Sequence, residues 1–193
     1  MDERGTFTLA ISGGTSPWPM FAAAAADAAM PWGSTEVFQV DERIAADGDP
    51  DRNWARAEQV LPLTRVRAFH PMPVTAPDLE QAAHDYDALL PQRLDMAHLG
   101  LGPDGHTASL VPGDEVLEVA DRRVALTGGE YQSRRRMTLT YPALAAARRL
   151  MWLVTGAAAA SALERLRAGD RSIPAGRVKG ASALVLADAA AAG

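Results

Sequence analysis

The sequence lacks cysteine entirely and contains a single lysine, Lys179. Without cysteine the chain can form no disulfide framework, no thiolate nucleophile and no zinc site of the cysteine type. The lack of cysteine fits a reducing compartment, and we expect a cytoplasmic protein. Whatever positive charge a binding site needs must come almost wholly from arginine.

Excess positive charge and long apolar runs are also absent. The formal net charge is −5, which argues against a general nucleic-acid surface. No apolar run approaches the ~18 residues of a membrane span, and no basic segment followed by an apolar one opens the sequence, so we expect no membrane segment and no secretory signal. A hydrophobic content of 48% with 22% charged residues is typical of a globular protein, and 193 residues suit one domain, 1–193.

Apolar β-prone runs alternate with helical patterns along the chain. Strands are expected at 6–11, 36–40, 66–69, around His98, and at 122–127, 134–140, 150–154 and 183–188, and helices from Pro17, at 54–61, after Asp78, at 142–149 and at 156–168. This alternation predicts an α/β fold: a mainly parallel, Rossmann-like sheet with helices on both faces.

The first expected strand ends in a glycine-containing loop, Ser12-Gly13-Gly14-Thr15-Ser16, which leads into a helix at Pro17. Glycines before a helix N-terminus let the backbone close on a ligand, and the free N–H groups favour a phosphate. The alternative is a tight turn with a capping hydroxyl, because the loop has neither a Walker lysine nor the full Gly-x-Gly-x-x-Gly spacing. This stretch alone does not distinguish a phosphate-binding loop from a capped turn.

Charge follows the second strand abruptly, in Asp41-Glu42-Arg43. Ligands of open α/β sheets bind at the carboxyl ends of the strands, so Arg43 could hold a phosphate or a substrate oxygen, and Asp41 could orient a partner. A surface Asp–Arg pair of small energetic value is the alternative.

A loop rich in glycine, at 99–110, carries Asp104 and His106 and lies near the middle of the chain. A short helix starting at Thr107 is expected to turn its free N–H groups toward this loop, beside the imidazole. Histidine has an ordinary pKa of ~6.5 and suits proton transfer near neutral pH. Alternatively, Asp104 only caps the helix and His106 is a solvated loop residue.

Three consecutive arginines precede a strand at 134–140. They form either an anion clamp or a solvated charge run. Alternate side chains of a strand face the same way, so Arg134 and Arg136 share a side, and we favour Arg136 as the ligand. The loops at 12–16, 41–43 and 102–106 and the segment after Thr155 all follow expected strands, so they can converge on one cleft.

Three of these blocks, 12–17, 41–43 and 100–113, resemble in order and spacing the signature blocks of 6-phosphogluconolactonases, and the similarity extends over nearly the whole chain. The related glucosamine-6-phosphate deaminases share the Gly-Gly-x-Thr and Asp-Gly-His elements. Their loop usually continues into an Ile-Ala-Phe-Asn-Glu run, whereas this sequence continues Thr-Ala-Ser-Leu-Val-Pro-Gly, which favours the lactonase.

The resemblance implies hydrolysis of 6-phospho-D-glucono-1,5-lactone to 6-phosphogluconate in the oxidative pentose phosphate pathway, without metal or organic cofactor. His106 would take a proton from the attacking water, Asp104 or Asp41 would orient the imidazole or the water, and an arginine such as Arg43 or backbone N–H groups would stabilise the oxyanion. The residues expected to bind substrate and phosphate are Ser12, Gly13, Gly14, Thr15, Asp41, Arg43, Gly102 and Arg136.

The sequence departs from the family pattern in two places. Family members commonly have a long helix before the first strand, which here starts near Thr6, so we expect one sheet face to be uncovered and a homodimer to form through it. The usual lysine after the Val-Thr-Gly block is replaced by Ala159, with Lys179 or Arg177 as candidate substitutes. Two alternatives therefore remain: a sugar-phosphate isomerase or deaminase, and a non-catalytic sugar-phosphate-binding protein.

Overall fold

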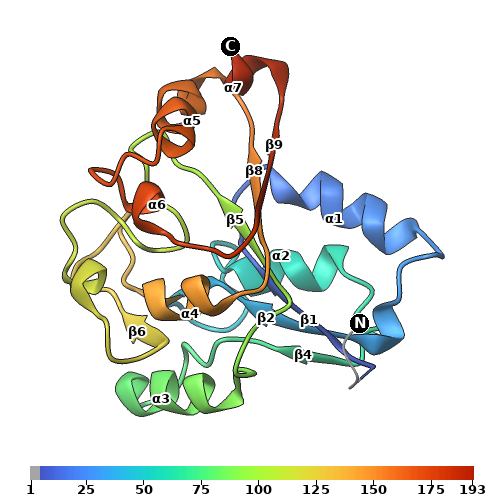
Figure 1. The fold of residues 1–193 in the computed structure, drawn as a ribbon. Helices are drawn as coiled ribbons and strands as arrows, with labels where there is room; N and C mark the ends of the chain where they lie inside the picture. The colour runs from blue at the N-terminus through green and yellow to red at the C-terminus, as the bar shows by residue number, and fades with distance from the viewer. Residues whose placement is uncertain (1–4) are drawn as a thin grey trace.

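The computed structural model describes residues 5–193 and is built around a six-stranded sheet (Figure 1). All its neighbouring strands are parallel. Their order across the sheet is β4 (Ala68–His70), β2 (Thr35–Gln39), β1 (Phe7–Ile11), β5 (Met96–Gly100), β8 (Leu150–Val154) and β9 (Ala183–Ala187). The predicted α/β fold with a mainly parallel sheet is confirmed.

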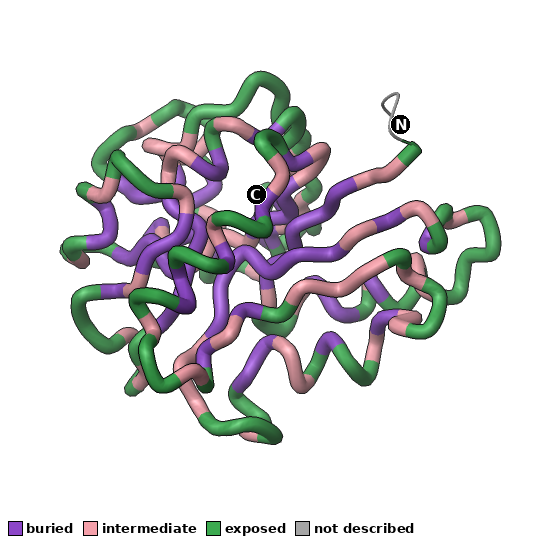
Figure 2. The backbone as a smooth tube through the Cα atoms, turned by 90° about the horizontal axis from the view of Figure 1, so that it is seen from below, coloured by how far each residue is buried: buried purple, intermediate pink, exposed green. Residues whose placement is uncertain are grey.

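Helices cover both faces of this sheet because side chains alternate along each strand. Leu9 and Ile11 of β1 pack in one apolar cluster with residues of α1 (Pro17–Ala26) and α2 (Asn53–Val60), whereas Ala10 faces the other cluster. That second cluster includes residues of α3 (Leu79–Leu89), α4 (Tyr141–Ala146), α5 (Ala160–Arg167), α6 (Pro174–Arg177) and α7 (Ala189–Ala192). Figure 2 shows the buried segments running through the middle of the molecule.

A second, antiparallel sheet contains β3 (Asp41–Arg43), β7 (Arg136–Leu139) and β6 (Val124–Leu126), with β7 in the middle. The chain passes from one sheet to the other at Val40, whose N–H donates to the carbonyl of Ile11 and whose carbonyl accepts from Leu139. The sequence predicted 41–43 as a charged loop that follows the second strand. Pairing with β7 makes it a strand and sets Arg43 opposite Arg136.

The prediction of a short helix starting at Thr107 is wrong. Thr107 and Leu110 instead close a tight turn by backbone hydrogen bonds, with Ala108 in the left-handed region at φ 51°. The Ser109 N–H donates to the hydroxyl of Thr138 on β7. This bond to a distant strand outweighs the local helical pattern, so no helix begins at Thr107.

Most other expected elements are present with shifted ends. Asp78 caps α3 by accepting from the Gln81 N–H, as predicted. The helix expected at 156–168 starts with a 3₁₀ turn, Ala157–Ala159, before α5, and further 3₁₀ turns lie at Trp32–Ser34 and Glu115–Glu118. Across residues 5–193, no helix has the length and apolar character needed to cross a membrane.

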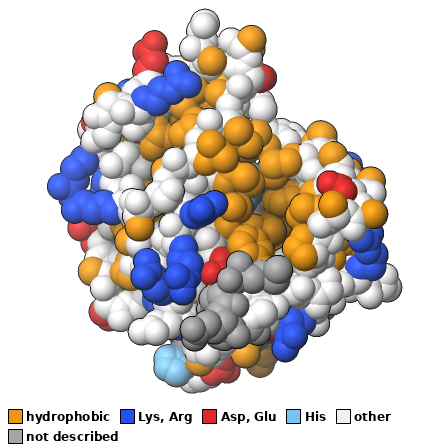
Figure 3. Space-filling view, turned by 45° about the vertical axis from the view of Figure 1, so that its right-hand side comes forward, with side chains coloured by type: hydrophobic (Ala, Val, Ile, Leu, Met, Phe, Trp, Pro, Cys, Tyr) orange, Lys and Arg blue, Asp and Glu red, His pale blue; other side chains and the backbone are white. Residues whose placement is uncertain are grey.

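One part of the sheet is only thinly covered. The register sets Met151 and Leu153 of β8 beside Leu184 and Leu186 of β9, on the face that α1 and α2 cover farther along the sheet. Leu184 is 53% exposed and Leu186 is 39% exposed. Figure 3 shows hydrophobic side chains gathered on this side of the molecule.

Candidate active site

A cavity of about 260 Å³ lies where the carboxyl ends of β1, β5 and β8 meet β3 and β7. Its walls include nine of the ten residues predicted from the sequence, namely Ser12, Gly13, Gly14, Thr15, Asp41, Arg43, Gly102, His106 and Arg136. The tenth, Asp104, contacts the cavity wall through His106. Segments far apart in the chain thus converge on one site.

His106 and Asp104 form a hydrogen-bonded pair. Asp104 Oδ1 lies 2.6 Å from His106 Nδ1 and also accepts from the His106 N–H at 3.1 Å. Burial works to raise the pKa of Asp104, but the hydrogen bonds from His106 and from the Tyr131 hydroxyl outweigh it and hold that pKa below its ordinary value. Asp104 is therefore a carboxylate at neutral pH. With it on the Nδ1 side, the imidazole's proton is held there and the Nε2 lone pair remains available.

Because Gly102 has no side chain, the His106 imidazole can occupy the space beside it. A Cβ at this position would overlap the His106 ring. The loop is closed by a bond from the Gly102 N–H to the His106 carbonyl, and by one from the Gly105 N–H to the Gly102 carbonyl, each 2.9 Å long. The glycines of this loop thus fix where the imidazole lies.

The glycine turn after β1 is held from two sides. A Cβ on Gly13 would overlap the side-chain amide of Asn53, and Gly14 has a φ of 97° that other residues rarely adopt. The Ser12 N–H donates to His98 Nδ1, and the Ser12 hydroxyl donates to the His98 carbonyl. Burial lowers the pKa of His98 to about 4, so this histidine is neutral. It is a buried residue of β5.

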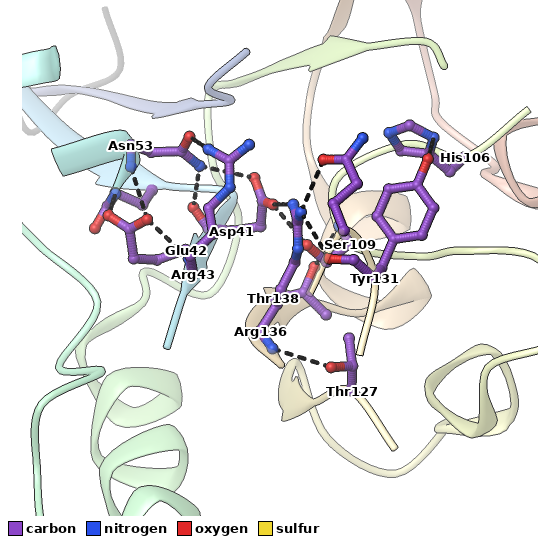
Figure 4. Close-up of polar contacts among 12 residues, drawn as sticks. Asp41, Glu42, Arg43, Asn53, His106, Ser109, Thr127, Tyr131, Arg136 and Thr138 are labelled. Atoms are coloured by element: carbon purple, nitrogen blue, oxygen red, sulfur yellow. Dashed lines mark hydrogen bonds and ion pairs between the residues drawn. The ribbon is translucent and has the colours of Figure 1, made fainter. Parts of the chain in front are cut away.

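Asp41 is nearly buried and ties β3 to the neighbouring loops. Its Oδ2 accepts from the Ser109 hydroxyl at 2.6 Å and lies 3.8 Å from Arg136 Nη1. Its carbonyl accepts from Asn53 Nδ2, while Asn53 Oδ1 accepts from Arg43 (Figure 4). Of the two carboxylates considered for orienting the imidazole, Asp104 is the one in contact with it, and Asp41 contacts the arginine side of the site.

Glu42 is fully buried, and its carboxylate accepts four hydrogen bonds. They come from the backbone N–H groups of Arg43, Asn53 and Trp54 and from the side chain of Gln39. Two of these donors belong to the first turn of α2, where negative charge is favourable. Glu42 thereby fixes the start of α2, and with it Asn53.

Arg136 is 4% exposed, and its guanidinium lies at the cavity. One terminal nitrogen donates to the Tyr131 carbonyl and to Gln132 Oε1, while Nε has no hydrogen-bond partner among the described residues. Burial and the neighbouring charge of Arg43 lower the pKa of Arg136, against the opposite pull of Asp41. An incompletely paired, buried guanidinium suits an anionic ligand. Arg134, on the same strand side by pattern, pairs with Asp49 instead.

The tail provides no replacement for the lysine whose place is taken by Ala159. Ala159 is buried. Arg177 donates to the Leu117 carbonyl and to Glu118, and Lys179 lines a different cavity together with Leu117. The two candidate substitutes are thus wrong, because Arg177 and Lys179 line this other cavity and not the one that contains His106.

Sequence reasoning missed four residues of the site: Asn53, Ser109, Tyr131 and Gln132. Asn53 comes directly before the helix expected at 54–61, and Ser109 lies in the glycine-rich loop at 99–110. Neither was singled out, because their contacts depend on how β3 folds back. Tyr131 and Gln132 lie in a stretch, 128–133, that carries no pattern of its own. Among residues 5–193, no group of three or more histidine and acidic side chains is arranged to hold a metal ion.

Comparisons with known proteins point to one family. Residues 1–186 match the family described as glucosamine-6-phosphate isomerases/6-phosphogluconolactonase. A 6-phosphogluconolactonase of Synechocystis is 38% identical over 184 residues, covering 87% of this chain and 74% of the relative.

Solved structures show the same fold. That of 6-phosphogluconolactonase from Thermotoga maritima superposes with a TM-score of 0.84 at 25% identity, covering 97% of this chain and 88% of the other. A monomeric glucosamine-6-phosphate deaminase superposes with a TM-score of 0.83 at 18% identity, covering 99% of this chain and 89% of the other. At that identity the likeness shows the fold alone.

Proposed function

The chain belongs to the glucosamine-6-phosphate isomerase/6-phosphogluconolactonase family, and we propose that it hydrolyses 6-phospho-D-glucono-1,5-lactone to 6-phosphogluconate. The observation that carries the proposal is one cavity lined by both a carboxylate-paired imidazole, His106, and two arginines, Arg43 and Arg136. A phosphorylated lactone needs both features: a base for the water that attacks C1, and cations for the phosphate.

The chemistry proposed for His106 is general-base catalysis. Asp104 holds the imidazole by Nδ1, so Nε2 takes a proton from water as the water oxygen bonds to C1 of the lactone. The C1–O5 bond then breaks, and the imidazolium returns the proton to the leaving ring oxygen. Water and lactone give one carboxylic acid with a free 5-hydroxyl. The carboxyl group then loses its proton to solvent.

The phosphate is proposed to lie between the glycine turn and the arginines. Gly13 and Gly14 bring the backbone of the turn to the cavity, next to Thr15 and Arg43. Arg136 contributes a buried guanidinium whose Nε has no hydrogen-bond partner in the described part of the chain. Burial strengthens a charge-assisted bond to phosphate because little water competes with it. We also propose Arg43 as a donor that stabilises the oxyanion forming at C1.

Turnover of freshly prepared lactone, followed in a pH-stat and corrected for spontaneous hydrolysis, tests the proposal. We expect a rate that is proportional to enzyme concentration. A parallel assay measures ammonia release from glucosamine 6-phosphate. Ammonia without lactone hydrolysis would assign the chain to the deaminases, and binding of sugar phosphate with neither reaction would make it a non-catalytic binding protein.

Self-association and location stay predictions. The exposed Leu184 and Leu186 support a homodimer through the thinly covered sheet face, because burying apolar surface favours association. Sedimentation velocity at micromolar concentration tests it, and a monomer would contradict it.

The lack of cysteine supports a cytoplasmic location. Fractionation of cells that make the protein tests that.

A further inference from the structure

A tight turn between β6 and β7 has an unusual backbone. The Tyr131 N–H donates to the Arg134 carbonyl at 3.0 Å, and the two residues between them, Gln132 and Ser133, have φ angles of 53° and 62°. Turns with two consecutive left-handed residues normally use glycine or asparagine, because a Cβ is disfavoured there. Neither residue here is of that kind. Contacts around the turn must therefore hold it in place.

The first of these contacts is made by the Tyr131 hydroxyl. It donates to Asp104 Oδ2 at 3.2 Å and lies 3.3 Å from His106 Nδ1, and the rings of Tyr131 and His106 are 5.0 Å apart between centroids. Asp104 Oδ1 is already occupied by His106, so the hydroxyl takes the second carboxylate oxygen. Both oxygens of Asp104 are then fixed, and the carboxylate cannot rotate away from the imidazole.

The second set of contacts joins the same turn to the arginine side of the cavity. Arg136 donates to the Tyr131 carbonyl and to Gln132 Oε1, and its guanidinium carbon lies 5.3 Å from the centre of the Tyr131 ring. Figure 4 shows the Tyr131 ring between Arg136 and His106. The titratable and charged groups facing Tyr131 are thus Asp104, His106 and Arg136.

We propose that Tyr131 is a positioning residue for the hydrolysis, whose hydroxyl locks Asp104 onto His106 and so keeps the imidazole in the form with a free Nε2. The inference rests on the proposed function of His106. Tyr131 itself stays protonated throughout: burial and the charge of Asp104 raise the pKa of its hydroxyl. Its role is to orient the base, and no proton leaves it during the reaction.

The test compares Tyr131→Phe with Tyr141→Phe. Both remove one hydroxyl, but the hydroxyl of Tyr141 donates to the Pro174 carbonyl, away from the cavity. For Tyr131→Phe we expect kcat to fall about tenfold with little change in KM, the loss typical of one hydrogen bond to a charged group. Asp104 then carries charge that the hydroxyl no longer offsets, so the acidic limb of the kcat/KM profile moves to higher pH. Tyr141→Phe should match the wild type.

A readout that does not need turnover separates this inference from the proposed function. Nitrogen-15 NMR of the histidine rings, with His106 assigned from its absence in His106→Asn, reports which ring nitrogen carries the proton. We expect the Nδ1–H form in the wild type and in Tyr141→Phe, and a mixture of both forms with a shifted titration midpoint in Tyr131→Phe. A wild type without lactonase activity would refute the proposed function, while the NMR result would still decide the role of Tyr131.

Two results would overturn the inference. One is unchanged His106 ring signals in Tyr131→Phe, together with an unchanged pH profile. The other is a rise in KM alone, which would assign the hydroxyl to ligand binding. Thermal melts of both tyrosine variants should stay within a few degrees of the wild type, since each loses one oxygen from a partly buried ring.

Discussion

Replacing Asp41 with asparagine should make the protein less stable and yet more responsive to phosphate. The Asp41 side chain is 6% exposed and lies 3.8 Å from the guanidinium of Arg136, whose side chain is 5% exposed. Asparagine keeps the shape of the residue but removes the charge that faces this buried cation. Arg136 is then left without its carboxylate.

The expected loss follows from the two contacts of Oδ2. The hydrogen bond from Ser109 is 2.6 Å long and charge-assisted, and such bonds contribute ~1.5–3 kcal/mol. Losing the pair with Arg136 adds to this, while the asparagine oxygen still accepts one bond. We expect a net loss of about 2–3 kcal/mol in the free energy of unfolding. For a chain of this size that corresponds to a melting temperature lower by roughly 5–10 °C.

Thermal unfolding at increasing inorganic phosphate measures both effects. A ligand stabilises the folded state by RT ln(1 + [L]/Kd), and a freed guanidinium should bind phosphate more tightly. The melting temperature of Asp41→Asn should therefore rise more steeply with phosphate than that of the wild type. Asp87→Asn is the control, because Asp87 pairs with Arg123 at 2.7 Å away from the cavity. An equal or weaker phosphate response in Asp41→Asn than in the wild type would refute the placing of phosphate at Arg136.

The remaining predictions concern one core histidine and two glycines. Burial lowers the pKa of His98 from 6.5 to about 4, so between pH 6.5 and pH 4 this side chain binds a proton only in the unfolded chain. The free energy of unfolding should therefore fall by up to ~3 kcal/mol as the pH drops from 6.5 to 4. Urea titrations of His98→Asn should show a smaller fall over that window, and an equal fall would contradict this assignment. Gly102→Ala should reduce kcat at least tenfold while phosphate still raises the melting temperature, because its Cβ displaces the His106 ring. Gly13→Ala should instead weaken phosphate protection, because its Cβ displaces the Asn53 amide that Arg43 contacts, and unchanged protection would count against that role.

Local patterns predicted the parallel sheet, and together with the family resemblance they indicated nine residues of the cavity wall. Strands such as 7–11 and 150–154 are short apolar runs bounded by glycine or polar residues, and the carboxyl ends of parallel strands meet at one edge. Residues that follow those strands, such as Gly13 and Gly102, must then lie together. The rule needs no knowledge of long-range contacts.

What the sequence did not predict depends on pairing between distant segments. The strand at 41–43 exists because β7 pairs with it, and the turn at 107–110 replaces a helix because Ser109 bonds to Thr138 and Asp41. The left-handed Gln132 and Ser133 are residues that turn rules do not place there. Tyr131 reaches Asp104 only through that turn.

The most direct test of the account is the lactonase rate of His106→Asn beside that of the wild type, with phosphate protection measured on the same samples. Asparagine cannot serve as the base, so the account predicts a loss of about 10²–10⁴-fold in kcat with phosphate protection retained. Lactone hydrolysis at the wild-type rate in a folded His106→Asn protein would contradict it.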